Sequence, residues 1–174
     1  DKVSVSIGQS NDYSISAWFK VNTFQFSGIV EWGEEATGKR RSLFLWNGGS
    51  GEYKLYSSTY GSNIAGSTSL STGVWYHGVV TVDVSNGSAK IYLNGSLDGT
   101  GTNTINSFTG TTGYIGTTGN DEFYNGIINE VAVWDKILDA NEVTALYNSG
   151  LPLLPTSDSG NYASADDLAG YWRN

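Results

Sequence analysis

The acidic side chains are the first candidates for chemistry, because paired carboxylates can hydrolyse glycosidic bonds. A retaining mechanism needs two carboxyl groups about 5–5.5 Å apart, which one face of a strand can present together. Glu31, Glu34 and Glu35 lack that spacing, since positions i and i+3 of a strand point to opposite faces. Asp121 and Glu122 are adjacent and also diverge. We therefore expect no catalytic residue and interpret these acids as turn charges, with a glycoside hydrolase as a minor alternative.

The only histidine of the chain, His77, is the second candidate. The chain has no cysteine, and no second histidine or nucleophile motif accompanies His77, so a catalytic triad is not supported. The surrounding segment WYHGVVTVDVSNGSAKIYLNG alternates on both sides of Asn86-Gly87, a pair typical of a type I′ hairpin turn. We expect an antiparallel hairpin over residues 75–93, with His77 packed as part of the scaffold.

Aromatic side chains are better candidates for binding, because sugars stack on rings while polar neighbours hold their hydroxyl groups. In RSLFLWN the two leucines face one way and Phe44 and Trp46 the other, and only one set can fill a core between two sheets. The segment EYKLYSSTY repeats this pattern with Tyr56 and Tyr60, and Trp32 stands in an expected turn. The sequence therefore predicts a glycan or protein contact among Trp32, Trp46, Tyr56 and Tyr60. The alternative is that these rings pack under loops or against a helix.

Composition limits the class of partner. The 174 residues suit one domain, and the net charge of −8 with a single basic cluster, Lys39-Arg40-Arg41, argues against nucleic acid. No apolar run approaches the 18 residues of a membrane span, so we expect no membrane insertion. Methionine is absent and residue 1 is Asp, from which we expect a processed product or a piece of a larger polypeptide.

Secondary structure is expected to be mainly short strands. Alternating segments separated by Gly, Asn and Ser recur throughout, which is typical of a sandwich or barrel. One helix is predicted in LDANEVTALYNSG, where Asp139 and Glu142 have the spacing of a capping box and Gly150 suits a left-handed position past the end. We expect the β-sandwich to cover residues 1–151, followed by a C-terminal loop and short strand, or a linker to a following domain, over 152–174.

The ordered motifs YSISAWFK, WYHGVVTVDVSNGSAKIYLNG, YIG and YNGIINEVAVWDKILDANEVTALYNSG support a family resemblance. Over roughly residues 1–150 the chain resembles a laminin-G-like domain of the concanavalin A-like lectin/glucanase superfamily, and the last motif is similar to pentraxins. The resemblance implies an all-β, two-sheet antiparallel jelly-roll sandwich with one short C-terminal helix after the strand that contains Trp134. Members are mostly binding modules, and one branch is enzymatic.

The resemblance also implies a possible cofactor. Related laminin-G-like domains often hold calcium near the first strand and near the motif matched here by IINEV, which places Asp1 and Asn129 at the corresponding positions. Many relatives carry Asp where this chain has Asn129, so one charge for Ca2+ is missing. The alternative is that Asn129 hydrogen-bonds within a turn and Asp1 is only a chain end.

Together these features predict a non-catalytic, lectin-like module of a larger extracellular, cell-surface or virion-surface protein, with a glycan or a surface protein as partner. The alternative is a structural decoration or adhesion domain of a viral particle or surface assembly, which would use the same fold for protein–protein contact.

Overall fold

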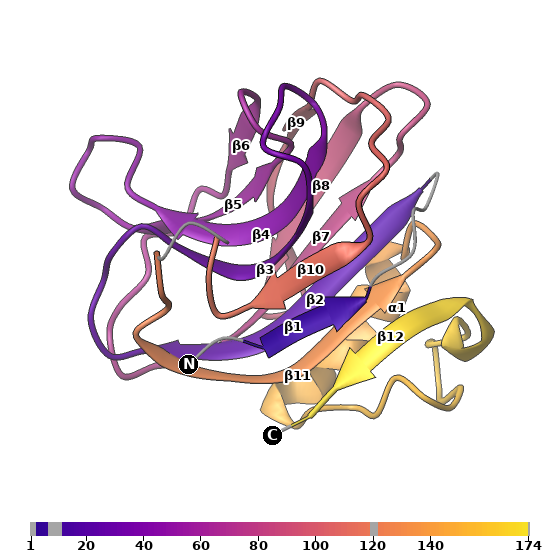
Figure 1. The fold of residues 1–174 in the computed structure, drawn as a ribbon. Coiled ribbons are helices and arrows are strands. Elements are labelled where there is room, and N and C mark those ends of the chain that lie inside the picture. Colours follow the sequence, from indigo (N-terminus) through magenta and orange to yellow (C-terminus); the bar gives the residue numbers. More distant parts are fainter. Residues whose placement is uncertain (1–2, 7–11, 119–121, 174) are drawn as a thin grey trace.

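The computed structural model describes residues 3–6, 12–118 and 122–173, and over these the chain folds as a sandwich of two antiparallel sheets (Figure 1). Sheet A contains, in spatial order, β1 (Val3–Ser6), β10 (Thr112–Ile115), β3 (Ser27–Gly33), β4 (Arg40–Trp46), β5 (Lys54–Ser58) and β6 (Asn63–Ala65). Sheet B contains β12 (Leu168–Trp172), β11 (Gly126–Trp134), β2 (Tyr13–Val21), β7 (Trp75–Val82), β8 (Ser88–Leu93) and β9 (Ser96–Thr102). The expected all-β jelly roll is confirmed.

The inner faces of the two sheets form the main core. In β2 every second side chain from Tyr13 to Val21 points inward and is buried, as the alternation YSISAWFKV predicts. Leu43 and Leu45 of β4 and Leu55 of β5 enter this core from sheet A and are fully buried. The leucines of RSLFLWN therefore supply the inner set, and the aromatic residues between them point out of the sandwich.

The hairpin over residues 75–93 is present, but its turn differs from the predicted one. β7 pairs with β8, and of Asn86-Gly87 only Gly87 has a positive φ, of 75°. The Asp83 carboxylate accepts hydrogen bonds from the backbone and hydroxyl of Ser85, and this holds a longer loop in place of a two-residue turn. The type I′ conformation instead occurs at Asn94 and Gly95, with φ of 50° and 77°, between β8 and β9.

The helix α1 (Ala140–Tyr147) covers part of the outer face of sheet B (Figure 1). Its capping box is the predicted one: Asp139 accepts from the Glu142 backbone, and the Glu142 carboxylate accepts from the Asp139 backbone. The left-handed turn after the helix begins at Asn148, with φ of 45°, two residues before the predicted Gly150. The helix forms a second apolar cluster with the outer side chains of β7, β8 and β11. Its buried members are Val79, Tyr92, Ala132, Trp134, Leu138, Val143, Leu146 and Tyr162.

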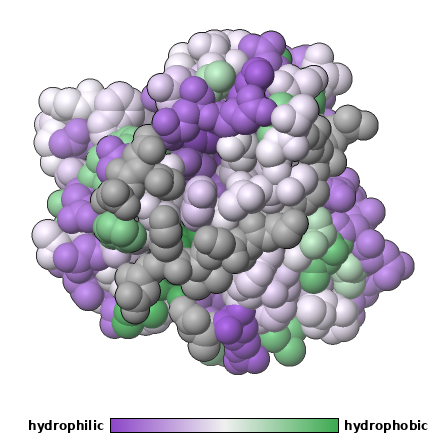
Figure 2. Space-filling view, in the orientation of Figure 1, coloured by the Kyte–Doolittle hydropathy of each residue, from purple (hydrophilic) through white to green (hydrophobic). Residues whose placement is uncertain are grey.

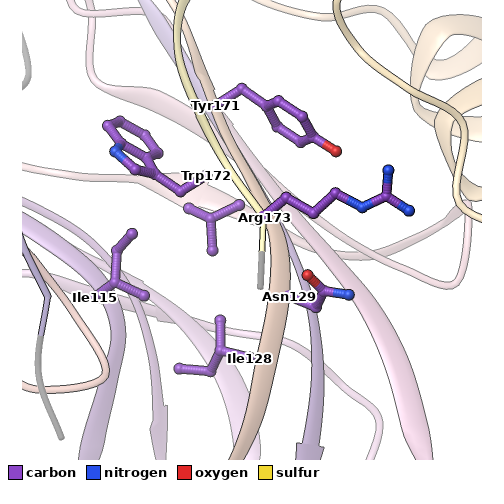
Figure 3. Close-up of a pocket in the computed structure, with 7 residues that line it drawn as sticks. Ile115, Ile128, Asn129, Tyr171, Trp172 and Arg173 are labelled. Atoms are coloured by element: carbon purple, nitrogen blue, oxygen red, sulfur yellow. The ribbon is translucent and has the colours of Figure 1, made fainter.

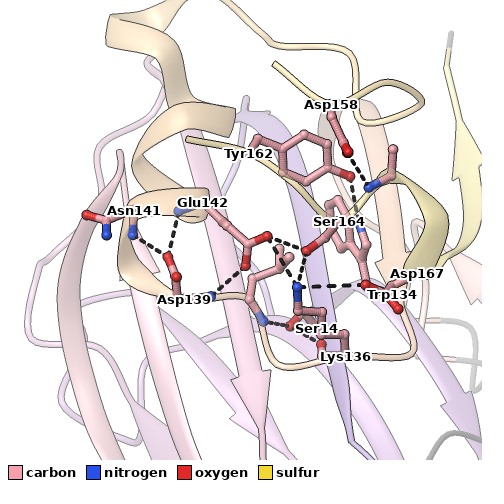
Figure 4. Close-up of polar contacts among 12 residues, drawn as sticks. Ser14, Trp134, Lys136, Asp139, Asn141, Glu142, Asp158, Tyr162, Ser164 and Asp167 are labelled. Atoms are coloured by element: carbon pink, nitrogen blue, oxygen red, sulfur yellow. Dashed lines mark hydrogen bonds and ion pairs between the residues drawn. The ribbon is translucent and has the colours of Figure 1, made fainter. Parts of the chain in front are cut away.

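A buried polar network fastens the chain after the helix onto this cluster (Figure 4). Glu142 is 4 % exposed; its carboxylate accepts from the Ser164 hydroxyl and lies 3.5 Å from Lys136 Nζ. The Trp134 indole donates to the Tyr162 hydroxyl at 2.8 Å. Further along, Leu168–Trp172 pairs with β11 as strand β12. Of the C-terminal segment 152–174, residues 168–172 thus form a strand of sheet B.

His77 lies in this scaffold as a buried, neutral ring. It stacks beside Trp18, with ring centroids 5.2 Å apart, and its Nε2 is 2.8 Å from the Ser16 hydroxyl. Tyr147 of the helix stacks on the same pair. Burial lowers the pKa of His77 to about 3, because the imidazolium form would lose its hydration.

The molecular surface is mixed in character. Figure 2 shows hydrophobic residues in small groups among hydrophilic ones on the side seen in Figure 1. Within the described residues, no helix has the length and apolar character required to cross a bilayer.

The state of His77 yields a first prediction. Its folded-state pKa lies below the ordinary value of 6.5, so folding favours the neutral ring, and the associated stability is lost as the pH falls below about 6.5. Since the chain has one histidine, its proton NMR signals can be followed without ambiguity. We expect them to stay constant from about pH 8 to pH 5 in the folded protein. A midpoint near 6.5 in folded protein would contradict the buried environment.

Glu142 yields a second prediction. Glu142→Ala removes one half of the capping box and the partner of Ser164, and should lower the unfolding free energy by about 2 kcal/mol, measured by urea denaturation. Asn141→Ala, an exposed neighbour in the same turn, is the matched control and should change stability by less than about 0.5 kcal/mol. Equal stability of the two variants would show that the network does not hold the segment.

Candidate functional site

The outer face of sheet A carries a group of four aromatic rings. Phe44 and Tyr56 are cross-strand partners on β4 and β5, and their ring centroids lie 5.3 Å apart. Trp46 contacts Tyr56 at 5.4 Å, and Phe26, just before β3, meets Phe44 at 5.5 Å and Trp46 at 6.4 Å. We call Phe26, Phe44, Trp46 and Tyr56 the outer aromatic cluster. Its side chains point away from the leucine core between the two sheets.

Exposure divides the outer aromatic cluster into a base and a surface. Phe44 is 2 % exposed and Tyr56 8 %, whereas Trp46 and Phe26 are only half-buried. The loop after β4 lies against the base, because a Cβ placed on Gly48 would come within 2.8 Å of the Tyr56 hydroxyl oxygen. Trp46 and Phe26 therefore offer the accessible ring surface, while Phe44 and Tyr56 support it from below.

A polar region occupies the other end of the same face. Glu31 of β3 pairs with Ser42 of β4 and with Tyr114 of β10, so these side chains form one row across the sheet. Arg40 Nη1 lies 3.3 Å from Glu31 Oε2, and the Arg40 guanidinium stands 5.1 Å from the ring centroid of Tyr60. Aromatic rings thus give way along β4 to polar groups, the Glu31 carboxyl beside the Arg40 guanidinium, an arrangement suited to a ligand with both apolar faces and hydroxyl groups.

Burial governs the protonation of Glu31. The side chain is largely removed from water, which raises the pKa of Glu31 to about 8, against the lowering effect of Arg40. Glu35 and Glu122 add a further raising effect through their negative charges. At neutral pH the Glu31 carboxyl therefore retains a proton to a large extent and can donate a hydrogen bond.

The residues nominated from sequence are separated by the structure. Trp46 and Tyr56 lie together in the outer aromatic cluster, whereas Tyr60, 37 % exposed, lies beside Arg40 near the opposite end of β4. Trp32 is corrected: it belongs to strand β3 and is 1 % exposed, with its ring 5.5 Å from Tyr13 inside the core. The register shift between Gly28 and Val30 in β3 changes which side chains face inward. The Trp32 ring is buried in the core as a result and is not accessible to a ligand.

Two members of the site were missed by the sequence reasoning. Phe44 has the same strand parity as Trp46, and that parity was its available signal. Phe26 precedes its strand, and no periodic pattern marks it.

The nominated metal residues are placed only in part. Asp1 lies outside the described residues. Asn129 of β11 borders a cavity of about 340 Å³ between β10, β11 and β12 (Figure 3). Its neighbour Glu130 is already ion-paired with Arg173, at 2.9 Å. Among the described residues there is no group of three or more His, Cys, Asp or Glu side chains that could hold a metal ion.

The two antiparallel layers and the aromatic outer face of sheet A define a lectin-like β-sandwich. The chain belongs to the concanavalin A-like lectin/glucanases superfamily, whose family model matches residues 2–144. The laminin-G-like relationship expected from the sequence motifs is thereby confirmed. No curated protein matches the chain at a significant level.

Three solved structures illustrate the relationship. A heptameric SAP-like pentraxin from Limulus polyphemus is 17 % identical with a TM-score of 0.66, over 82 % of this chain and 72 % of the pentraxin. A putative carbohydrate-binding protein from Bacteroides ovatus is 23 % identical with a TM-score of 0.70, over 98 % of this chain. Domain 4 of an extracellular arabinanase from Geobacillus stearothermophilus, in complex with arabinotriose, is 25 % identical with a TM-score of 0.60, over 80 % of this chain and 68 % of that one. The chain spans 48 % of the Bacteroides protein.

Glu31 yields a third prediction. Its pKa is raised in the folded state above the ordinary 4.5, so wild-type stability is highest below about pH 4.5 with respect to this group and declines as the pH rises through 8. Glu31→Gln cannot ionise, and its unfolding free energy should exceed that of the wild type progressively toward pH 8, by on the order of 2 kcal/mol. Urea denaturation between about pH 5 and pH 8 measures this. Asp166→Asn, an exposed acid, is the control; parallel curves for wild type and Glu31→Gln would contradict a protonated Glu31.

Proposed function

We propose that this chain is a non-catalytic, lectin-like module that binds neutral glycans through the outer aromatic cluster of sheet A. The observation that carries the proposal is the partly buried Trp46 and Phe26 pair on a face that the core does not require. A pyranose or furanose ring has apolar C–H faces that stack on such rings. The Glu31 carboxyl and the Arg40 guanidinium, 3.3 Å apart, add polar groups to the same face.

A neutral ligand is favoured over a charged one. The protein carries a net charge of −8, which repels acidic polysaccharides. The arabinanase domain found in complex with arabinotriose supports an uncharged oligosaccharide. We propose an extracellular or virion-surface setting within a larger polypeptide, in keeping with that extracellular relative.

Calcium at Asp1 and Asn129 remains a separate proposal. Asn129 lies on sheet B, whereas the outer aromatic cluster lies on sheet A, so glycan binding at the cluster does not depend on that metal.

The glycosidase alternative would have to use Glu31, the buried acid on the glycan-binding face. Its raised pKa is the property of a general acid. The Glu34 carboxylate, however, is held by Lys39 at 3.0 Å and by the Thr109 backbone at 2.9 Å, and the Glu122 carboxylate by the Thr118 hydroxyl. These contacts fix the nearby acids in turns, and we therefore assign Glu31 to binding.

Trp46 provides the test of this function. Arabinotriose and neutral oligosaccharides of glucose, galactose and xylose are titrated into the protein by calorimetry, with and without a chelator. We expect at least one to bind, and Trp46→Ala to weaken it about tenfold, which corresponds to about 1.4 kcal/mol of lost stacking. The affinity should be the same with the chelator.

Leu97→Ala, which removes an exposed apolar side chain from β9 of the other sheet, is the control and should leave the affinity unchanged. Unaltered binding by folded Trp46→Ala would overturn the assigned site. Failure of every oligosaccharide to bind would favour the protein-contact alternative, and release of reducing ends that stops in Glu31→Gln would favour the glycosidase.

A further inference from the structure

A β-bulge in β11 places two polar side chains on the same outer face of sheet B. The register between β11 and β2 shifts between Asn129 and Ala132, so that two residues, Glu130 and Val131, stand opposite Ala17. Val131 enters the core, whereas Asn129 and Glu130 both border cavities on the outer side, together with Trp18. Glu130 adopts a left-handed φ of 50°, a conformation that is unfavourable for a non-glycine residue. Strain of this kind in a buried acid calls for a functional explanation.

The Glu130 carboxylate is fixed in position by Tyr171 of the C-terminal strand and by Arg173 just after it. Arg173 Nε donates to Oε1 at 2.9 Å, and the Tyr171 hydroxyl donates to Oε2. Figure 3 shows Tyr171, Arg173 and Asn129 on one side of β11 and β12, with Trp172, Ile115 and Ile128 on the other. Glu130 is 6 % exposed. Each of its carboxylate oxygens accepts one of these hydrogen bonds and keeps one lone pair for a further donor.

Glu130 and Asn129 border a pocket between two tryptophans. The pocket has a volume of about 210 Å³, and we call it the bulge pocket; it is lined by Trp18, Trp75, Asn129, Glu130, Gly150 and Pro152. Trp18 is held by stacking on His77 and Tyr147 and is 7 % exposed. Trp75 is 41 % exposed, and Pro152 belongs to the chain that leaves helix α1. The bulge pocket thus lies where the helical cover of sheet B ends.

The charges around the bulge pocket select the ligand. Arg173 compensates Glu130, and Lys20 Nζ already lies 5.5 Å from the ring centroid of Trp75, so a cationic ligand gains little. An anionic ligand would meet the Glu130 carboxylate. A neutral ligand with an apolar face for the indole rings and hydroxyl groups for the carboxylate and the amide satisfies both constraints. The volume lies below the range of about 300–1,000 Å³ of pockets for drug-sized ligands, and suits one sugar ring.

We propose that the bulge pocket is a second saccharide site, which binds a single neutral sugar residue independently of the outer aromatic cluster. The two sites lie on the outer faces of opposite sheets, so one module can hold two glycan chains, or two parts of one branched glycan.

The experiment follows the indole N–H signals by two-dimensional NMR, assigned through single Trp→Phe variants. Glucose, galactose, arabinose and N-acetylglucosamine are titrated one at a time to tens of millimolar. We expect the Trp75 signal of the wild type to shift saturably with at least one of them. Glu130→Gln should weaken that response at least fivefold, and Trp75→Ala should abolish the matching shift of the Trp18 signal. Trp46→Ala, which disables the other site, should leave the response unchanged.

Several outcomes overturn the proposal. They are an unmoved Trp75 signal with all four sugars, a Trp18 shift that persists in Trp75→Ala, and a response to tetramethylammonium in place of sugars. Should Glu130→Gln fail to fold, Asn129→Ala replaces it with the same expected weakening, because Asn129 also lines the bulge pocket. If Trp46→Ala loses oligosaccharide binding in the calorimetric titration but keeps the Trp75 response, the result concerns only the outer aromatic cluster on sheet A. The two saccharide sites can therefore fail independently.

Discussion

Burial of the inner faces of the two sheets against each other is the interaction on which the rest of the molecule depends. Each strand presents alternate side chains to two sides, so commitment of one set to the shared core decides where the other set must point. In β2 the committed set runs from Tyr13 to Val21, and in β4 it is Leu43 and Leu45. The outward positions of Ser16, Trp18, Phe44 and Trp46 follow from this.

The outward apolar side chains of the two sheets are covered in different ways. On sheet B the outward apolar residues are covered by helix α1 and by the segment that ends in β12, and Glu142 and Ser164 join these pieces by a buried hydrogen bond. On sheet A no helix among the described residues performs this task, and the outward rings pack on one another. An aromatic surface that neither core nor helix needs is the physical basis of the binding function that we propose.

The bulge at Glu130 shows how local strain and site geometry are coupled. A regular strand would alternate Asn129 and Glu130 between the faces, and the inserted residue turns both toward the same side. Tyr171 of β12 and Arg173, which follows this strand, donate to the carboxylate, so the conformational cost at Glu130 is offset by charge-assisted hydrogen bonds. Strand β12 therefore extends sheet B and, through Tyr171, also helps to hold the Glu130 carboxylate.

Much of this protein is determined by local sequence. The alternation of β2, the hairpin of residues 75–93, the capping box at Asp139 and Glu142, and the outward parity of Trp46 could all be predicted, because each depends on neighbours a few residues apart. The burial of Trp32, the meeting of Phe26 with Trp46 and the raised pKa of Glu31 could not. These depend on register shifts, on side chains from distant strands and on desolvation, which arise only when the sheets are assembled. The sequence alone thus determined which residues alternate and where helix α1 begins. Tertiary structure decided which aromatic rings reach the surface and which acids lose their water, because burial is a property of the packed sandwich and not of any single strand.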